Sequence, residues 1–252
     1  MRVEAIYRYP VKGLSAEALD EVALTAGACL PHDRRFALAQ GDAPFDPAHP
    51  RFLPKQNFAC LMANPRLALI RSVFDPHDHA LSLSAPGQEP LLANPTSEAG
   101  RRAIAAWLTR FLGPEARGTP VFHEAPGHNF TDQARKGVSI VNLATLHAVE
   151  ERIGRRIEPL RLRANIYISG PPPWAEREWL GQEIQLGTAR LKPFKQTVRC
   201  PATMVNPATG QRDIDLPALL AAHWGHRELG IHAEVVEDGR VAVGDGVELL
   251  PG

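Results

Sequence analysis

Short segments in which apolar and polar residues alternate, separated by turn-forming residues, fill much of the first hundred positions. Such alternation gives a strand one face for a core and one face for solvent. The pattern predicts five strands, at Val3–Tyr7, Glu21–Thr25, Phe36–Ala39, Leu67–Phe74 and Ala80–Ser84. We therefore expect a small β-rich unit, and a chain of 252 residues with 44% hydrophobic residues can bury a real core.

The stretch from Gly41 to Phe58 breaks this pattern, because it contains four prolines and little periodicity. A connection of this length without regular structure is either a loop with a function or a mobile insertion. We expect a loop at the rim of a site.

An amphipathic helix is predicted over residues 96–113. Five large apolar residues share one face of it: Ile104, Trp107, Leu108, Phe111 and Leu112. Thr96 or Ser97 can cap its start, and Gly113-Pro114 stops it. The composition changes directly after this helix. We therefore place a domain boundary there, with a β-barrel-like domain at residues 1–113 and a second domain at residues 114–252.

The second half is expected to be dominated by strands, with two or three helices. One helix should run from Asn142 to about Ile153 and end at Gly154, and DIDLPALLAAHWG predicts another. The segments RLRANIYISG, EIQLG and ARLKPFKQTVRC indicate strands, and Asp238-Gly239 indicates the tip of a terminal hairpin. The predicted fold class is α+β and β-dominated, with two β-barrel-like units and a few peripheral helices.

Composition excludes several classes of function. Lys+Arg and Asp+Glu number 28 each, without a Lys/Arg-rich run, so nucleic acid is not an expected partner. The sequence contains neither a G-x-G-x-x-G motif after a strand nor a P-loop. The N-terminal stretch MRVEAIYRYPVKGL resembles neither a signal peptide nor a membrane span, which predicts a cytoplasmic protein without membrane contact.

The three cysteines are too few and too widely spaced for a disulfide framework, a structural zinc site or an ordinary iron–sulfur cluster. Cys200 lies between Arg199 and Pro201 in a turn-rich segment, where basic neighbours favour the reactive thiolate. The alternative is a small buried hydrophobic residue, the usual state of a free cysteine. Core packing is the expectation for Cys29 and Cys60.

Arg161, Arg163 and Asn165 alternate along the strand predicted at RLRANIYISG, so they should project to one side. Guanidinium groups at that spacing suit a phosphate or a carboxylate, although a solvated sheet face with surface ion pairs explains them equally well. Lys12 and Arg34 are each, taken alone, surface residues. The histidines come without an H-E-x-x-H motif and are expected to be surface or core residues.

The ordered segments RLRANIYISG, PWAEREWLGQEIQLG, RCPATMVNPATGQRD and GRVAVGDGVELL resemble the motifs of the MOSC family, which is named for the C-terminal domain of molybdenum cofactor sulfurase. YPVKGLSAEAL and DRRFAL resemble its companion N-terminal β-barrel domain. The relatives that this resemblance implies include amidoxime-reducing proteins. The chain departs from them at Ala164, at Asn206-Pro207, and at Pro54-Lys55-Gln56, which stands where they have a Thr-x-Arg pattern.

The resemblance implies a bound molybdenum cofactor, molybdopterin, in a cleft between the two domains. It assigns Cys200 as the ligand of the metal or as a carrier of sulfur. It places Arg163 and Asn165 against the pterin and its phosphate, with Lys12 and Arg34 on the phosphate arm and Lys136 to Asn142 as another cofactor-facing segment. Arg199, beside the cysteine, is expected to be cofactor-binding too.

The function expected from this resemblance is that of a reductase of N-hydroxylated or similar small oxygenated substrates, supplied with electrons by a separate protein. One alternative is a sulfur-transfer or cofactor-carrier protein with a persulfide on Cys200. Another is a small-molecule-binding barrel without catalysis.

Overall fold

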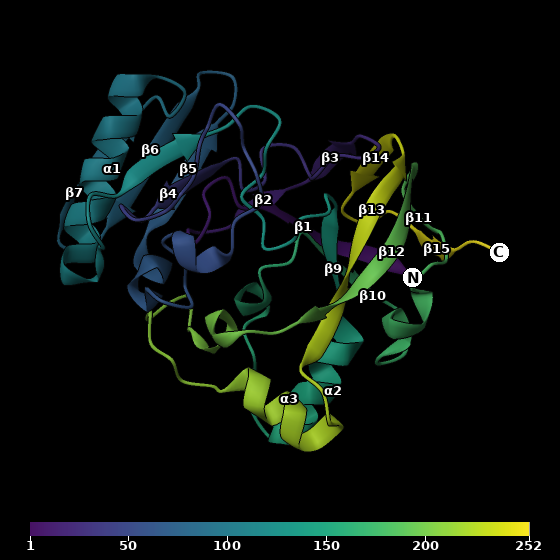
Figure 1. Cartoon of the computed structure of the whole chain (residues 1–252). Coiled ribbons are helices and arrows are strands. Elements are labelled where there is room, and N and C mark those ends of the chain that lie inside the picture. The colour runs from purple at the N-terminus through teal and green to yellow at the C-terminus, as the bar shows by residue number, and fades with distance from the viewer. Residues whose placement is uncertain (252) are drawn as a thin grey trace.

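The computed structural model describes residues 1–251 and is built around one large curled sheet (Figure 1). Its eight strands run in the order β15-β11-β12-β13-β9-β10-β1-β2. Their bounds are β1 Arg2–Arg8, β2 Glu17–Leu19, β9 Val138–Asn142, β10 Ile166–Ser169, β11 Ile184–Leu186, β12 Ala189–Val198, β13 Glu228–Glu237 and β15 Val247–Leu249. Among these neighbours β9 and β10 are parallel, and the other pairs are antiparallel.

Three smaller sheets complete the strand pairing within residues 1–251. β5 (Arg71–Asp75), β6 (Ala80–Ala85) and β7 (Gln88–Ala93) form an antiparallel meander. β4 (Phe36–Ala39) pairs with β8 (Val121–Glu124), and β3 (Glu21–Leu24) pairs with β14 (Gly239–Ala242). The predicted β-dominated α+β class is confirmed.

Helix α1 (Glu98–Leu112) forms where its apolar stripe predicts it. The Ser97 side chain accepts a 3.0 Å hydrogen bond from Gly100 N at its start, and Gly113 ends it. Trp107 and Phe111 stack with ring centroids 6.1 Å apart. Because the whole stripe is buried, α1 closes the core around the meander β5–β6–β7 (Figure 1).

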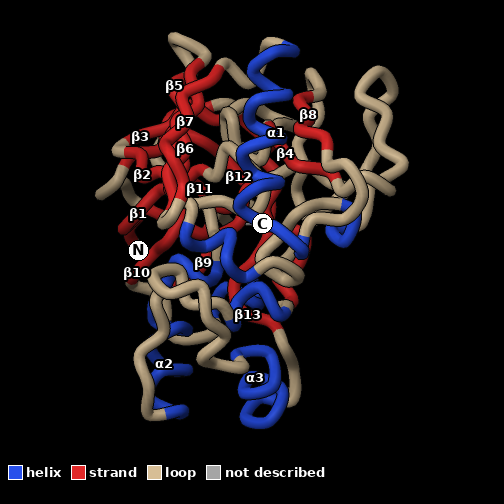
Figure 2. Tube along the Cα trace, turned by 90° about the vertical axis from the view of Figure 1, so that its left-hand side faces the viewer, coloured by secondary structure: helices blue, strands red, loops and turns tan. Residues whose placement is uncertain are grey.

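Helices α2 (Leu143–Ile153) and α3 (Leu216–Trp224) lie side by side at the opposite end of the molecule (Figure 2). Asn142 and Asp215 cap their first turns through side-chain oxygens, and left-handed Gly154 and Gly225 end them. Short 3-10 helices occupy Lys55–Asn57, Pro65–Leu69, Gly113–Glu115, Pro159–Leu162, Ala175–Trp179 and Pro201–Met204.

The inner face of the large sheet forms one continuous apolar core. Val3, Ile140, Ile166 and Ile231 are each at most 1% exposed, and they come from four adjacent strands. Burying branched side chains of this kind contributes about 1.5–3 kcal/mol each. This core holds in place the ends of β9, β10, β12 and β13, near which the candidate site is built.

Three sequence predictions were wrong in detail. The strand predicted over RLRANIYISG begins only at Ile166, because Pro159 starts a 3-10 turn and Arg163 takes a left-handed conformation with φ 51°. Arg161, Arg163 and Asn165 therefore do not alternate along a strand. The predicted strand Leu67–Phe74 likewise starts only at Arg71, after a 3-10 helix.

The predicted terminal hairpin is also wrong, because β14 pairs with β3 rather than with β13. Asp238 supports the pairing of β14 with β3, since its Oδ1 accepts a 2.7 Å hydrogen bond from the backbone N–H of Ala26, two residues after the end of β3. At Gly239 a Cβ atom would lie 2.3 Å from Ala189 N, so only glycine permits this crossing.

Two strand pairs join segments on opposite sides of the boundary predicted at residue 113. β1 pairs with β10, and β8 pairs with β4. The boundary at residue 113 stays a prediction. Across residues 1–251, none of the helices is both long and apolar enough to span a bilayer.

Candidate functional site

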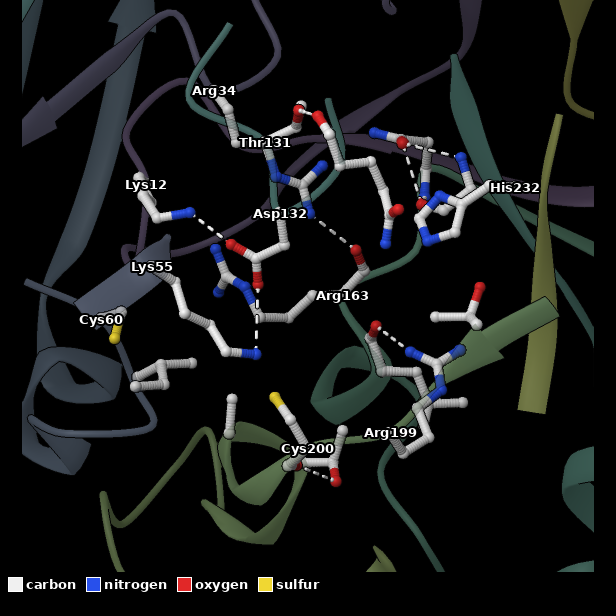
Figure 3. Close-up of a pocket in the computed structure, with 18 of the residues that line it drawn as sticks. Lys12, Arg34, Lys55, Cys60, Thr131, Asp132, Arg163, Arg199, Cys200 and His232 are labelled. Carbon is white, nitrogen blue, oxygen red and sulfur yellow. Dashed lines mark hydrogen bonds and ion pairs between the residues drawn. The ribbon is translucent and has the colours of Figure 1, made fainter. Parts of the chain in front are cut away.

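A cavity of about 220 Å³ opens where loops from both halves of the chain meet (Figure 3). The N-terminal half contributes the segments around Lys12, Arg34 and Lys55. The C-terminal half contributes the β8–β9 connection, the turn before β10 and the end of β12. Residues far apart in sequence thus share one wall.

Cys200 lines this cavity two residues after the end of β12, in extended conformation (φ −120°, ψ 171°). Its carbonyl oxygen accepts hydrogen bonds from Thr203 N at 3.0 Å and from Thr203 Oγ1 at 2.9 Å, which fix the backbone. Its partly exposed thiol points into the cavity (Figure 3). Cys29 and Cys60 are buried, as expected, but Cys60 is also part of the cavity wall.

Lys55 brings an ammonium group to Cys200, and sequence reasoning did not select it. Its Nζ lies 3.6 Å from Asp132 Oδ2 and points toward the Cys200 sulfur (Figure 3). Burial by itself would lower the pKa of Lys55, but Asp132 and Cys200 raise it above the ordinary value. Two features of the sequence pointed to this region: the proline-rich stretch predicted to be a rim loop, near whose end Lys55 lies, and Pro54-Lys55-Gln56, which stands where the relatives have a Thr-x-Arg pattern.

Asp132 is the second residue that sequence reasoning missed. Lys12 Nζ donates to its carboxylate and, at 2.9 Å, to the carbonyl oxygen of Phe130. Burial alone would raise the pKa of Asp132, yet Lys12 and Lys55 hold it down at about 2. Asp132 is therefore an anion that bridges two lysines from different loops.

Arg34 and Arg163 both lie against the ring of Tyr9, with guanidinium carbons 4.3 Å and 4.4 Å from its centroid. Arg34 Nη2 donates a 2.8 Å bond to the carbonyl oxygen of Arg163, whose Nη1 donates a 2.7 Å bond to Leu14 O. Burial lowers the pKa of Arg163 to about 10, so it stays charged at neutral pH. Both arginines have left-handed backbones, and strain of this kind clusters at functional sites.

Asn165 and Arg199 line the cavity, but their polar atoms are bound within the protein. Asn165 Oδ1 accepts from Ser139 N at 3.0 Å and from Ser139 Oγ at 2.9 Å. Arg199 donates 2.8 Å bonds to the carbonyl oxygens of Leu229 and Leu162, and its burial lowers its pKa to about 10. Both side chains brace the wall, and Arg199 adds charge to it.

The other end of the cavity carries groups that sequence reasoning also missed. His232, on β13, stacks on Phe194 with centroids 6.3 Å apart. Burial and the charge of Arg199 lower the pKa of His232 to about 4, so the imidazole is neutral at pH 7. The buried Thr197 Oγ1 has no hydrogen-bond partner anywhere in residues 1–251. A hydroxyl left in this state is available to a polar ligand.

The cavity concentrates positive charge in a chain whose formal net charge is zero. Seven basic residues line it: Lys12, Arg34, Lys55, Arg135, Arg161, Arg163 and Arg199. Two acidic residues, Asp33 and Asp132, accompany them. Such a lining selects anionic ligands.

The fold and the cavity together define a β-rich protein that presents one thiol and many basic groups to an anionic ligand. The MOSC N-terminal β-barrel domain matches residues 1–116, and the MOSC domain matches residues 122–248. The chain belongs to the MOSC family, which confirms the resemblance seen in its motifs.

Two curated relatives have related sequences. Human mitochondrial amidoxime-reducing component 1 is 29% identical over 186 residues, which cover 61% of this chain and 54% of that protein. Its mouse counterpart is 35% identical over 74 residues, which cover 29% of this chain and 21% of that protein. The matches thus span about half or less of these relatives.

Solved structures show weaker likeness. The YuaD protein from Bacillus subtilis gives a TM-score of 0.47 at 17% identity, covering 98% of this chain and 94% of that chain. YiiM from Geobacillus stearothermophilus gives a TM-score of 0.36 at 21% identity, covering 45% of this chain and 54% of that chain.

Proposed function

We propose that the protein binds a molybdenum cofactor, molybdopterin, in this cavity and that Cys200 is the protein ligand of the metal. The single observation that carries the proposal is the Cys200 thiol, which points into a cavity lined by seven basic residues. A soft sulfur ligand suits such a metal, and a metal in turn keeps its thiol ligand deprotonated.

The donor set fits this group. Residues 1–251 contain no cluster of three or more His, Cys, Asp or Glu side chains that could hold a metal ion. A metal here would therefore need ligands that arrive with it, and molybdopterin carries its own sulfur atoms. The unpartnered Thr197 Oγ1 in the cavity wall offers a hydrogen bond to such a polar ligand.

Lys12, Arg34 and Arg163 would hold the phosphate of the cofactor. The three basic side chains come from separate segments, and the Arg34–Arg163 hydrogen bond ties two of these segments together. Asn165 and Arg199 would support this wall from behind through their backbone bonds. In the structure the anion among these cations is Asp132, so a bound phosphate would share Lys12 with it.

The reaction we propose is the reduction of N-hydroxylated or similar small substrates, in which the N–O bond breaks and two electrons and two protons yield the reduced nitrogen compound and water. When bound, the cofactor supplies the two-electron chemistry. The chain supplies orientation through Cys200 and a protonated amine at Lys55 Nζ, which lies beside the thiol and can donate a hydrogen bond to the departing oxygen.

A separate electron-donor protein is part of this proposal, because the described residues contain three free cysteines and no group of three or more His, Cys, Asp or Glu side chains that could hold a second metal centre as a source of electrons. A cytoplasmic location also belongs to the proposal.

The test compares Cys200→Ser with Cys60→Ser, a matched control in the same cavity wall. We expect wild type and Cys60→Ser to carry molybdenum and to reduce a small amidoxime with a reduced viologen dye. Cys200→Ser should lose most of both. Full metal content and activity in Cys200→Ser would refute the proposal.

The second candidate is a sulfur carrier with a persulfide on Cys200. The observation that favours it is Lys55, whose ammonium can stabilise an anionic sulfur on Cys200. Intact-protein mass spectrometry separates the two, because a carrier gains the mass of one sulfur atom on Cys200 and purifies without molybdenum.

A further inference from the structure

Four basic side chains either line the cavity or hydrogen-bond to residues that line it, and we call them the basic rim: Lys55, Arg135, Lys195 and Arg212. Lys55 and Arg135 line the cavity directly. Lys195 Nζ donates a 3.1 Å hydrogen bond to Gln133 Oε1, and Arg212 Nη2 donates a 2.7 Å bond to Met62 O. Gln133 and Met62 are themselves lining residues, so all four basic side chains belong to or adjoin the wall of one cavity.

The basic rim is accessible to a partner. The Arg135 side chain is 53% exposed, and Lys195 and Arg212 are exposed residues. The rim also has acidic neighbours, since Glu234 forms an ion pair with Arg135 and Asp132 pairs with Lys55. Lys195 and Arg212 have no ion pair with any residue in 1–251, so no acidic side chain there neutralises their charge.

An exposed apolar residue lies inside the basic rim. Val198 lines the cavity, is 51% exposed and precedes Cys200 by two residues. A small apolar contact enclosed by charged residues is the usual organisation of a protein–protein interface. A macromolecule that contacts Val198 would therefore stand next to the cysteine that we assign to the metal.

The charge pattern specifies the chemistry of that partner. The basic rim has only four charges, and the whole chain has equal numbers of basic and acidic residues, 28 each. A nucleic acid backbone is bound by a more extended basic surface. The four charges of the rim do suit a compact acidic surface, because complementary charges accelerate encounter and set orientation.

From these observations we infer that the basic rim docks the acidic face of a one-electron carrier protein, with Val198 as the apolar contact beside Cys200. This inference rests on the proposed function, which requires external electrons. Two successive one-electron transfers oxidise two carrier molecules and reduce one substrate, with two protons taken up and one water released. Interfaces of this kind are small and short-lived, so the association is weak and depends on salt.

Surface plasmon resonance tests the inference on the metal-free protein, with an oxidised, acidic plant-type [2Fe–2S] ferredoxin as the probe. We expect binding at low ionic strength that weakens strongly at about 0.15 M salt. The double variant Lys195→Glu/Arg212→Glu should bind more than about tenfold more weakly. Val198→Ser should also weaken binding without changing its dependence on salt.

Arg102→Glu is the matched control, because Arg102 lies on α1, is 68% exposed and is not among the lining residues described. It should bind as the wild type does. Equal affinity of the double variant, or no association of the wild type at low salt, would overturn the inference. Molybdenum content and activity with a viologen dye, which needs no docking surface, report separately on the proposed function.

Discussion

Arg34 donates a 2.8 Å hydrogen bond from Nη2 to the carbonyl oxygen of Arg163, and this bond joins the two halves of the chain inside the cavity. The two guanidinium groups share the Tyr9 ring, where burial raises the pKa of the tyrosine to about 12. Tyr9 therefore stays neutral and serves as a platform for both charges.

Replacing Arg34 should weaken both folding and cofactor retention. Arg34→Met leaves Asp33 Oδ2 and the Arg163 carbonyl oxygen without the Arg34 donor, which costs about 1.5–3 kcal/mol of unfolding free energy. Urea unfolding measures this loss, and metal analysis measures retention. Arg35→Met, which removes an ion pair with Glu124 outside the cavity lining, should reduce stability but leave molybdenum content intact. Equal retention in both variants would contradict the role given to Arg34.

Asp132 should make stability sensitive to acid. Its pKa of about 2 lies below the value of about 3.9 expected in an unfolded chain. Its contribution is therefore fully present above about pH 4 and is lost as the pH falls toward 2. Unfolding free energies measured across this window should fall more steeply for wild type than for Asp132→Asn. If the unfolding free energies of wild type and Asp132→Asn fell in parallel across this window, the ion pairs of Asp132 with Lys12 and Lys55 would be contradicted.

His232 should titrate far below an ordinary histidine. Burial and the nearby arginines lower its pKa to about 4, against about 6.5 in an unfolded chain. The unfolded chain then binds more protons between these values, so this group's contribution to stability is lost as the pH falls from about 6.5 to about 4. NMR titration of the His232 ring should give a midpoint near 4, and His232→Phe should remove this part of the acid sensitivity. A titration midpoint above pH 6 would contradict the burial of the His232 ring beside the arginines.

Glu176 should be a structural carboxyl outside the site. It is 1% exposed and accepts hydrogen bonds from Asn142 Nδ2 at 3.0 Å and from Thr145 Oγ1 at 2.9 Å. Burial raises its pKa. Glu176→Ala leaves both donors buried without this acceptor and should cost about 2–4 kcal/mol. Glu178→Ala, an exposed position two residues on, should cost less than about 0.5 kcal/mol. Chemical denaturation measures both losses, and similar losses of unfolding free energy in the two variants would contradict the structural role given to Glu176.

Local signals in the sequence were sufficient where one segment decides its own structure. Helix α1 begins after Ser97 and ends before Gly113, because capping and an apolar stripe act within that segment. Arg163 shows the limit, since a proline four residues earlier replaced the predicted strand by a turn and aimed its guanidinium at Tyr9.

Contacts between distant segments could not be predicted from sequence. Lys55 begins a short 3-10 helix near the end of the proline-rich stretch, and Asp132 lies in the β8–β9 connection. They meet only because the folded chain brings both to the wall of one cavity. The pairing of β14 with β3 has the same origin. Cys200 could be predicted as a site residue because its motif and its place in a turn are features of the local sequence. Its neighbours in space, Lys55 and Asp132, come from distant segments and could not be predicted in this way.

The central claim is that the Cys200 sulfur is the protein ligand of molybdenum. X-ray absorption at the molybdenum edge of the purified protein tests it most directly. We predict one more sulfur neighbour around the metal in wild type and Cys60→Ser than in any molybdenum that Cys200→Ser retains. Identical sulfur coordination in all three proteins, or wild-type protein without molybdenum, would contradict the claim.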